Sequence, residues 1–363
     1  GYGITDAKTS TEQDSDITAS VNTLKDGAPT ELNDLNKIAA AINDDADFFN
    51  TVKKYTLQYA PKSVIQGHTS GFLHGGQDLS SIPGSSTNRI DSFPFASDAN
   101  TTNEGTFGFK TGYAGSFVDP SGNYFVAGGE TNPTSISGSP PTGFHSTIYR
   151  KNSGDVGDLS TAKAYVSSSQ SSTHGYISGG ATPPSNAIRT IEKVQMTSPF
   201  VVSTVGDLSE QKYYGAGCSS SHCGYETGGV NPGATPPPSN LNTIERFPFA
   251  VDTYSSDIAD LTGGRYGHAG NSSDTHGYMS GGSIGPDHPS GNTPWSSNTS
   301  REKFAFANNN NAADVGDLAS AFDRRATGVN SDVSGYTAGS TGTNVSTDCL
   351  LYTSDAADER SSV

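Results

Sequence analysis

The stretch that decides the fold is Val156–Gly282, in which one pattern is written three times. A Gly-Asp-Leu or Ala-Asp-Leu segment is followed, after a run of small and polar residues, by a Gly-Tyr segment that ends in Gly-Gly. The copies are VGDLS (Val156–Ser160) with THGYISGG (Thr173–Gly180), VGDLS (Val205–Ser209) with HCGYETGG (His222–Gly229), and IADLT (Ile258–Thr262) with THGYMSGG (Thr275–Gly282). Self-similarity at a fixed period indicates one supersecondary unit per copy, packed on its neighbours.

Weaker copies extend the pattern in both directions. They are SGFLHGG at Ser70–Gly76, NYFVAGG at Asn123–Gly129 and SGYTAGS at Ser334–Ser340. Positions 76, 129, 180, 229, 282 and 340 are separated by 53, 51, 49, 53 and 58 residues. A period of about fifty residues is typical of four-stranded propeller blades. The sequence therefore predicts an all-β propeller over residues 62–347, with five to six blades of four antiparallel strands.

The recurring residues are predicted to have structural roles. Each Gly-Gly should lie where backbones approach closely, since only glycine tolerates such crowding. These glycines are Gly75, Gly76, Gly128, Gly129, Gly179, Gly180, Gly228, Gly229, Gly281 and Gly282. The recurring acids Asp158, Asp207, Asp260 and Asp317 are expected to bond to nearby backbone in a turn, with calcium binding left open. The recurring Tyr176, Tyr225, Tyr278 and Tyr336 are predicted to form core between blades.

A second repeated segment ends in Phe-x-Phe. It reads RIDSFPF at Arg89–Phe95, TIERFPF at Thr243–Phe249 and REKFAF at Arg301–Phe306. Alternation places both rings of each pair on one face of a strand. Pro94 and Pro248 cannot donate to a ladder, which favours an edge position, so the outermost strand of a blade is predicted here.

Four inserts of different length separate the Gly-Gly segments from the strands that follow. They cover residues 131–146, 181–187, 231–242 and 283–300. Equivalent loops of successive blades gather on one face, so the inserts should form a continuous rim there. Candidate receptor-binding residues on this rim are Phe144, His145, Asn231, Asn240, His288 and Trp295. The alternative is that the inserts are tolerated surface loops without a ligand.

Residues 1–60 differ from the repeats and are predicted to be an N-terminal fibre or oligomerisation segment. Within it, Leu32, Leu35, Ile38 and Ile42 follow helical spacing, which predicts a helix over 31–42. So short a helix needs a partner for its apolar stripe. Packing on its own chain and self-association around a fibre axis are both open.

Two resemblances add to these observations. Gly27-Ala28-Pro29, Leu32, Leu35, Ile38-Ala39, Ala41-Ile42, Asp44-Asp45, Phe48 and Thr51-Val52 resemble a segment that recurs in bacteriophage tail-fibre proteins, from which Asn33 and Asp34 depart. The repeats resemble kelch-like propellers, especially those of marine-phage structural proteins, although the aromatic spacing usual in kelch blades is absent and Trp295 is the only tryptophan. The resemblance implies a virion tail-fibre protein, with a homotrimer through the N-terminal segment and other tail proteins as partners.

The two ends of the chain carry separate expectations. Residues 348–363 resemble, from Cys349 onward, the translation of a sequencing adaptor, which predicts that native sequence ends near Thr347 and that blades are missing. The chain begins at Gly1 without methionine, so its natural start is expected to lie upstream.

Composition and motifs argue against several functions. The net charge of −16 disfavours a nucleic-acid partner, and no apolar run reaches the eighteen residues or so that a membrane helix needs. His174, His222 and His276 recur with the repeat, which favours a turn-facing role over a metal site. Cys218 and Cys223 are expected to be free thiols. No catalytic motif is present, so no catalytic, cofactor or metal-binding residues are predicted.

The resulting hypothesis is a non-enzymatic phage tail-fibre or virion structural protein. Its propeller loops would bind a glycan or protein of the host cell surface. The alternative is a secreted, extracellular bacterial propeller, either a lectin or a kelch-type carbohydrate-active enzyme, with residues 1–60 as a linker.

Overall fold

The computed structural model describes Ser15 and residues 69–351, apart from 79–84, 98, 132–142, 185, 234–238, 285–295, 323–325, 332 and 342–343. The chain divides into two compact units, Gly1–Pro61 and Lys62–Val363. The helix expected at 31–42, residues 352–363, His288 and Trp295 lie outside the described residues.

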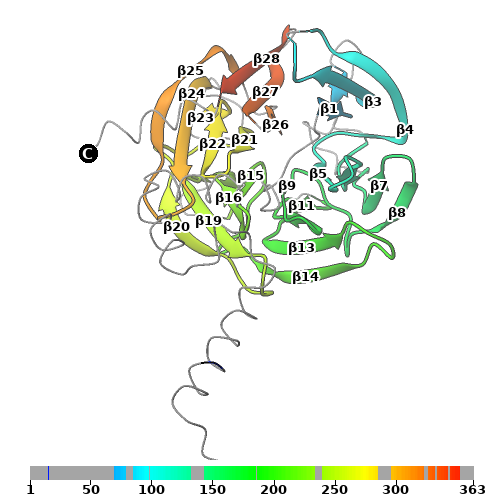
Figure 1. Ribbon diagram of the computed structural model, residues 1–363, viewed down its shortest axis with the longest axis horizontal. Helices are drawn as coiled ribbons and strands as arrows, with labels where there is room; N and C mark the ends of the chain where they lie inside the picture. The colour runs from blue at the N-terminus through cyan, green and yellow to red at the C-terminus, as the bar shows by residue number, and fades with distance from the viewer. Residues whose placement is uncertain are drawn as a thin grey trace, which may run out of the picture. The chain divides into compact units, whose positions relative to one another are not determined.

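Described secondary structure in the second unit is all β and forms a β-propeller, seen along its axis in Figure 1. Four consecutive blades each consist of four antiparallel strands in chain order from the axis outward. They are β5 (Gly115–Val118), β6 (Tyr124–Ala127), β7 (Thr147–Arg150) and β8 (Gly154–Asp158); β9 (Ser167–Gln170), β10 (His174–Ser178), β13 (Thr190–Gln195) and β14 (Val202–Asp207); β15 (Ala216–Ser219), β16 (Cys223–Thr227), β19 (Thr243–Pro248) and β20 (Ser256–Asp260); and β21 (Ala269–Ser272), β22 (His276–Ser280), β24 (Ser296–Ala305) and β25 (Ala313–Phe322). One sequence repeat thus gives one four-stranded meander.

Two further sheets lie side by side where the ring closes (Figure 1). One contains β1 (Ser70–His74), β3 (Ser85–Pro94) and β4 (Thr102–Thr111), and the other contains β26 (Thr327–Asn330), β27 (Ser334–Thr341) and β28 (Asn344–Leu351). Each has three radial strands within the described residues, where four were expected. β28 pairs with β27 along its whole length, so the backbone of residues 348–351 belongs to this sheet.

The repeated tyrosine joins one blade to the next. Tyr225 on β16 packs on Phe304 and Phe306 of the following blade, with ring centroids 5.4 and 4.8 Å apart. Tyr336 on β27 makes the same contact with Phe93 and Phe95, at 5.2 Å from each. The chain's first and last sheets are therefore joined by the contact that joins neighbouring blades elsewhere.

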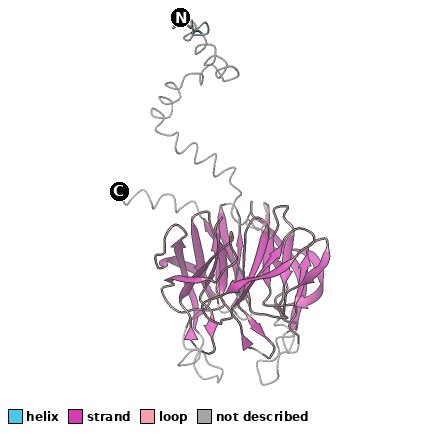
Figure 2. Cartoon of the chain, turned by 90° about the horizontal axis from the view of Figure 1, so that it is seen from below, coloured by secondary structure: helices cyan, strands magenta, loops and turns pink. Residues whose placement is uncertain are grey.

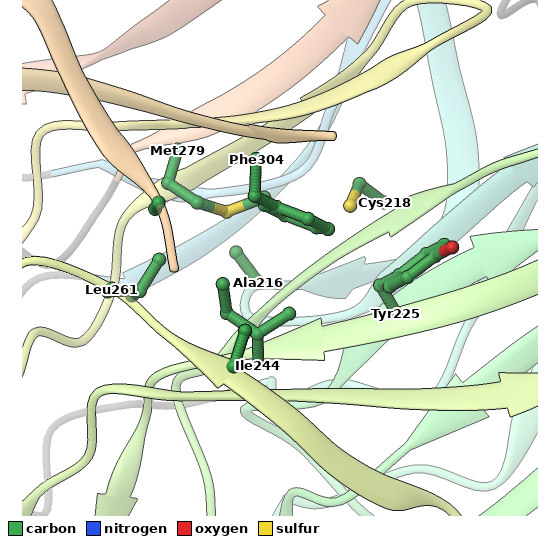
Figure 3. Close-up of a cluster of buried hydrophobic side chains, with 9 residues drawn as sticks. Ala216, Cys218, Tyr225, Ile244, Leu261, Met279 and Phe304 are labelled. Carbon is green, nitrogen blue, oxygen red and sulfur yellow. The ribbon is translucent and has the colours of Figure 1, made fainter. Parts of the chain in front are cut away.

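The apolar core lies between blades. In the cluster of Figure 3, Ala216, Tyr225 and Ile244 of one blade meet Met279 and Phe304 of the next. Burying each large apolar side chain of this kind contributes about 1.5–3 kcal/mol. Tyr176, Tyr225 and Tyr278 are at most 2% exposed and Tyr336 is half-buried, in agreement with their predicted place between blades.

The Phe-x-Phe strand is the third strand of its blade, so the prediction of an outermost strand is wrong. β3, β19 and β24 are each covered by a further strand, β4, β20 and β25 respectively. Pro248 is tolerated because pairing with β20 stops at Arg246, and Pro94 because pairing with β4 stops at Ser92. Beyond these points the missing N–H deprives no outer ladder of a donor.

Both glycines of each Gly-Gly have positive φ angles, for example 59° at Gly179 and 94° at Gly180. A Cβ on Gly179 would lie 2.8 Å from the carbonyl oxygen of Lys212, and one on Gly228 would lie 2.5 Å from that of Arg265. The same carbonyls accept bonds from the second glycines, Gly180 and Gly229, at 2.9 Å each. The pair thus fastens each blade to the connection that leaves it.

Two belts of hydrogen bonds run around the axis, one at each end of the inner strands. In the first belt, backbone N–H groups donate to the backbone oxygen of the equivalent residue in the preceding blade: Tyr165 to Tyr113 (2.9 Å), Tyr214 to Tyr165 (3.0 Å), Gly267 to Tyr214 (2.7 Å) and Ala326 to Gly267 (3.2 Å). In the second, a backbone N–H donates to the side-chain oxygen of the following blade: Val118 to Gln170, Gln170 to Ser219, Ser219 to Ser272 and Ser272 to Asn330, at 2.8–3.0 Å. This explains the small polar residues of the inner strands.

Candidate functional site

The inserts leave the propeller on one face, which we call the insert face. Three of them begin as short ribbons: β11 (Ala181–Thr182) with β12 (Asn186–Ala187), β17 (Val230–Asn231) with β18 (Ser239–Asn240), and β23 (Ser283–Ile284) with the start of β24. Each insert starts at a backbone bridge to the connection between blades, as in the pairs Ala164 and Ala181, Tyr213 and Val230, Tyr266 and Ser283, and Gly112 and Glu130. Figure 2 shows the propeller from the side, with its strands running between the two faces of the ring.

A cavity of about 770 Å³ lies within the ring of inner strands. Its wall is formed mainly by small and polar residues, including Ser167–Gln170 and Ala216–Ser219. At the insert face its lining includes Tyr113, Tyr165 and Tyr214, which directly precede the inner strands. In the first sheet the lining comes from β1 and β3, through Phe72, Leu73, His74 and Asp91.

These tyrosines and Tyr213 pack on one another, and we call the four the tyrosine cluster. Ring centroids of Tyr165 lie 4.7 Å from Tyr113 and 4.6 Å from Tyr214, and those of Tyr213 and Tyr214 lie 5.3 Å apart. All four are half-buried. Phe144 joins them with an edge contact to Tyr165 at 5.8 Å. Aromatic surface therefore gathers where the cavity meets the insert face.

Three members of the cluster have a left-handed backbone. Their φ angles are 57° at Tyr113, 59° at Tyr165 and 60° at Tyr214, and Gly267 takes 63° at the same place in the next blade. This conformation costs an ordinary residue about 1–2 kcal/mol, whereas glycine adopts it freely. The backbone belt does not require the tyrosine side chains, because Gly267 makes the same bond.

Glu130 is fully buried and contacts the tyrosine cluster through Tyr165. The hydroxyl of Tyr165 donates a hydrogen bond to Glu130 Oε2. Burial raises the pKa of Glu130, an effect that the bond from Tyr165 partly opposes. Burial together with this bond also raises the pKa of Tyr165. The phenol of Tyr165 therefore stays protonated, and its hydrogen bond to Glu130 fixes the position of the ring.

The cavity lining holds no lysine or arginine among the described residues. Burial lowers the pKa of His74 to about 4. Burial, aided by the charges of Arg265 and Lys212, holds the pKa of His268 well below its usual value. Both imidazoles are therefore neutral near pH 7, and Asp91, the acidic residue of the described lining, pairs with Arg89 at 2.6 Å. In the part of the chain that the structure describes, no three His, Cys, Asp or Glu side chains come together as metal ligands.

Sequence reasoning missed a set of buried ion pairs that recurs with the repeat. A cation in the connection entering a blade pairs with a glutamate on the third strand of that blade: Lys163 with Glu192, Lys212 with Glu245 and Arg265 with Glu302. All six side chains are at most 2% exposed. The signal was present in the sequence as a cation four or five residues after each Asp-Leu and a glutamate in each third strand.

One carboxylate breaks the repeat. Glu226 on β16 occupies the position of Ile177 and Met279 in the neighbouring blades, and it is 1% exposed. It accepts hydrogen bonds from the hydroxyls of Ser167 (2.6 Å) and Ser178 (2.7 Å). Burial raises its pKa to about 7. This group therefore titrates near neutral pH behind the cavity wall.

The structure separates the candidate rim residues. Phe144 joins the tyrosine cluster, whereas the His145 ring packs on Phe109 at 5.3 Å in the interface between blades. Asn231 donates to Glu210 at 2.7 Å and accepts from the Gly233 N–H at 2.9 Å. Asn240 ends β18 and is half-buried.

Three of the recurring acids, Asp158, Asp207 and Asp260, end the fourth strand of their blade, whereas Asp317 lies within β25. Their bonds reach neighbouring segments rather than their own turn. Asp158 accepts from the Ser146 hydroxyl and Asp317 from that of Thr299, at 2.8 Å each. Asp207 pairs with Arg189 at 3.1 Å, and the backbone N–H of Asp260 donates to Asn311 at 3.0 Å. The hydrogen bonds within the turns are made instead by Asp155 and Asp314, which accept from the backbone N–H groups of Gly157 and Gly316. His174, His222 and His276 bond to hydroxyls of the turns before them, and Cys218 and Cys223 are free thiols.

Comparison with protein-family models finds no match, and comparison with curated proteins finds no similar sequence. Within the described residues, no helix has the length and apolar character needed to cross a membrane. The geometry of the insert face is therefore the basis for a functional proposal.

Proposed function

We propose that this chain is a non-enzymatic attachment protein, a phage tail-fibre or related virion structural protein with kelch-like repeats, whose insert face binds a glycan or protein of the host cell surface. The observation that carries the proposal is the insert face itself. There, inserts of unequal length start at equivalent bridges in successive blades, on the face where the half-buried tyrosine cluster lies. A conserved scaffold with variable loops at one end is how binding surfaces are commonly built.

In this proposal residues 1–60 are the oligomerisation segment, through which three copies of the chain form a homotrimer. The same segment contacts other tail proteins of the virion. The charge of −16 supports a partner other than nucleic acid. The tyrosine cluster would serve equally in an extracellular bacterial propeller lectin, which is the second candidate. The two differ in what residues 1–60 do. A trimer in solution that dissociates when these residues are deleted would favour the fibre.

The test is binding of the fluorescently labelled chain to a panel of bacterial cells. Three variants replace residues 132–142, 234–238 or 285–295 with short Gly-Ser turns. Matched controls are Ser172→Lys and Asp274→Lys, in exposed turns of the opposite face. The insert variants should lose cell binding and keep the parent's melting temperature, whereas the controls should bind as the parent does. Undiminished binding by all three insert variants would refute the proposal, as would failure of the parent to bind any cell.

A further inference from the structure

The tyrosine cluster holds aromatic rings at positions that the backbone would give to glycine. Gly267 occupies this position in the next blade and makes the same belt bond, so tyrosine is not needed for the fold of the connection. The rings are also half-buried, unlike Tyr176 and Tyr225 in the core. Strained residues that persist where an unstrained choice exists are a reason to look for a function.

The surface they form has the chemistry of a sugar-binding platform. A half-buried tyrosine ring offers an apolar face beside a hydroxyl that donates and accepts hydrogen bonds. A sugar ring offers the matching pattern of C–H faces and hydroxyl edges. Beside the cluster, the cavity lining is formed by small and polar residues such as Ser167–Gln170.

The charges select among sugars. The described lining holds no cation, the carboxylate of Asp91 in its wall is already paired with Arg89 at 2.6 Å, and the chain carries a charge of −16. A uronate, sialate or phosphate group would therefore find no cationic partner there and would be disfavoured by the overall charge. A volume of about 770 Å³ is within the range of sites that enclose a small ligand.

We propose that the tyrosine cluster and the cavity beneath it bind the ring of an uncharged hexose or hexose oligomer. The inference rests on the proposed function and names the chemical class of its receptor. It places the decisive contacts on Tyr113, Tyr165 and Tyr214 at the insert face.

The experiment titrates the full chain, by calorimetry, with neutral trisaccharides of glucose, galactose, mannose and N-acetylglucosamine, and with the corresponding uronate trisaccharides. The parent should bind at least one neutral trisaccharide, and bind its acidic counterpart more weakly. Tyr113→Gly and Tyr214→Gly should each weaken binding about tenfold, the equivalent of one stacking contact. Tyr113→Phe should retain most of the affinity, because it keeps the ring face.

Folding is controlled in the same variants. Both glycine variants should melt no lower than the parent, because glycine suits the φ angles there. Tyr254→Ala, at an exposed tyrosine remote from the cavity lining, should bind as the parent does. Equal binding of neutral and acidic sugars, or full affinity in the Tyr113→Gly/Tyr214→Gly double variant, would overturn the inference. If the parent binds cells through its inserts but binds none of the neutral trisaccharides, the inference is wrong and the proposed function stands.

Discussion

Removing one partner of a buried ion pair should destabilise the propeller strongly, and Lys212→Met is the sharpest case. Lys212 Nζ lies 2.6 Å from Glu245 Oε1, and both side chains are 0% exposed. Burial alone would raise the pKa of Glu245, but the Lys212 ammonium holds it below its usual value. Methionine matches the apolar stem of lysine and leaves the carboxylate buried without its cation.

The expected loss is about 3 kcal/mol of folding stability, near the lower end of the range of about 3–5 for breaking a buried pair. The lower end applies because Glu245 still accepts from the Ser209 N–H at 2.7 Å and from the Ser255 hydroxyl. For a unit that spans Lys62–Val363, that corresponds to a melting temperature lower by roughly 5 °C. The double variant Lys212→Met/Glu245→Gln removes both charges and should recover most of the loss, because no charge then remains buried.

Thermal melts at several pH values provide the assay. In the parent, the lowered pKa of Glu245 gives stability that is present above its unfolded pKa and lost as pH falls. In Lys212→Met burial dominates and the carboxyl prefers to be protonated, so the deficit relative to the parent should grow from pH 5 to pH 8. A single variant within about 1 kcal/mol of the parent at pH 8 would refute the reasoning, as would a double variant no more stable than the single one.

Three further predictions concern single residues. Gly179→Val should unfold or truncate the propeller, because φ is 59° and the new Cβ would lie 2.8 Å from a hydrogen-bonded carbonyl oxygen. The control Gly263→Ala, whose new Cβ would meet no atom within 4 Å, should leave the melting temperature unchanged. Equal melting temperatures for the two variants would show that the close approach at Gly179 is wrong. Asp158→Ala should cost only about 1 kcal/mol, since it removes one exposed bond from Ser146, and a loss above about 3 would contradict that role. Glu226→Gln mimics the protonated carboxyl. Because burial raises the pKa of Glu226 from 4.5 to about 7, the stability it provides in the parent is complete below pH 4.5 and lost as pH rises through 7. The variant should therefore match the parent's stability near pH 4.5 and exceed it by about 3 kcal/mol at pH 8. The same stability difference at both pH values would contradict the assignment.

The sequence by itself was sufficient for the propeller, because its repeat records a local requirement met once in every blade. Gly179-Gly180 and its equivalents need positive φ angles in every copy, and the tyrosine of each repeat packs on the neighbouring blade. Such requirements leave the same residues at the same spacing, which self-similarity exposes without any knowledge of the contacts.

The order of the strands within a blade could not be predicted from the repeat. Alternating Phe-x-Phe shows that one face of the strand is buried, and proline shows that one donor is missing, but neither says how many strands lie beyond it. Only the assembled sheet shows that pairing ends before Pro248 and that β20 covers the rest of β19.

The candidate site depended on tertiary structure for its contacts. Tyr113, Tyr165 and Tyr214 stand 52 and 49 residues apart, and the last two occupy the same place after VGDLS, but only closure of the ring places the three in contact. The buried pair of Lys212 and Glu245 likewise joins two segments 33 residues apart. A local sequence pattern indicates the backbone conformation of a residue and the face on which its side chain lies. Contacts around the axis depend instead on the rotation between successive blades, and the sequence of a single repeat does not specify that rotation.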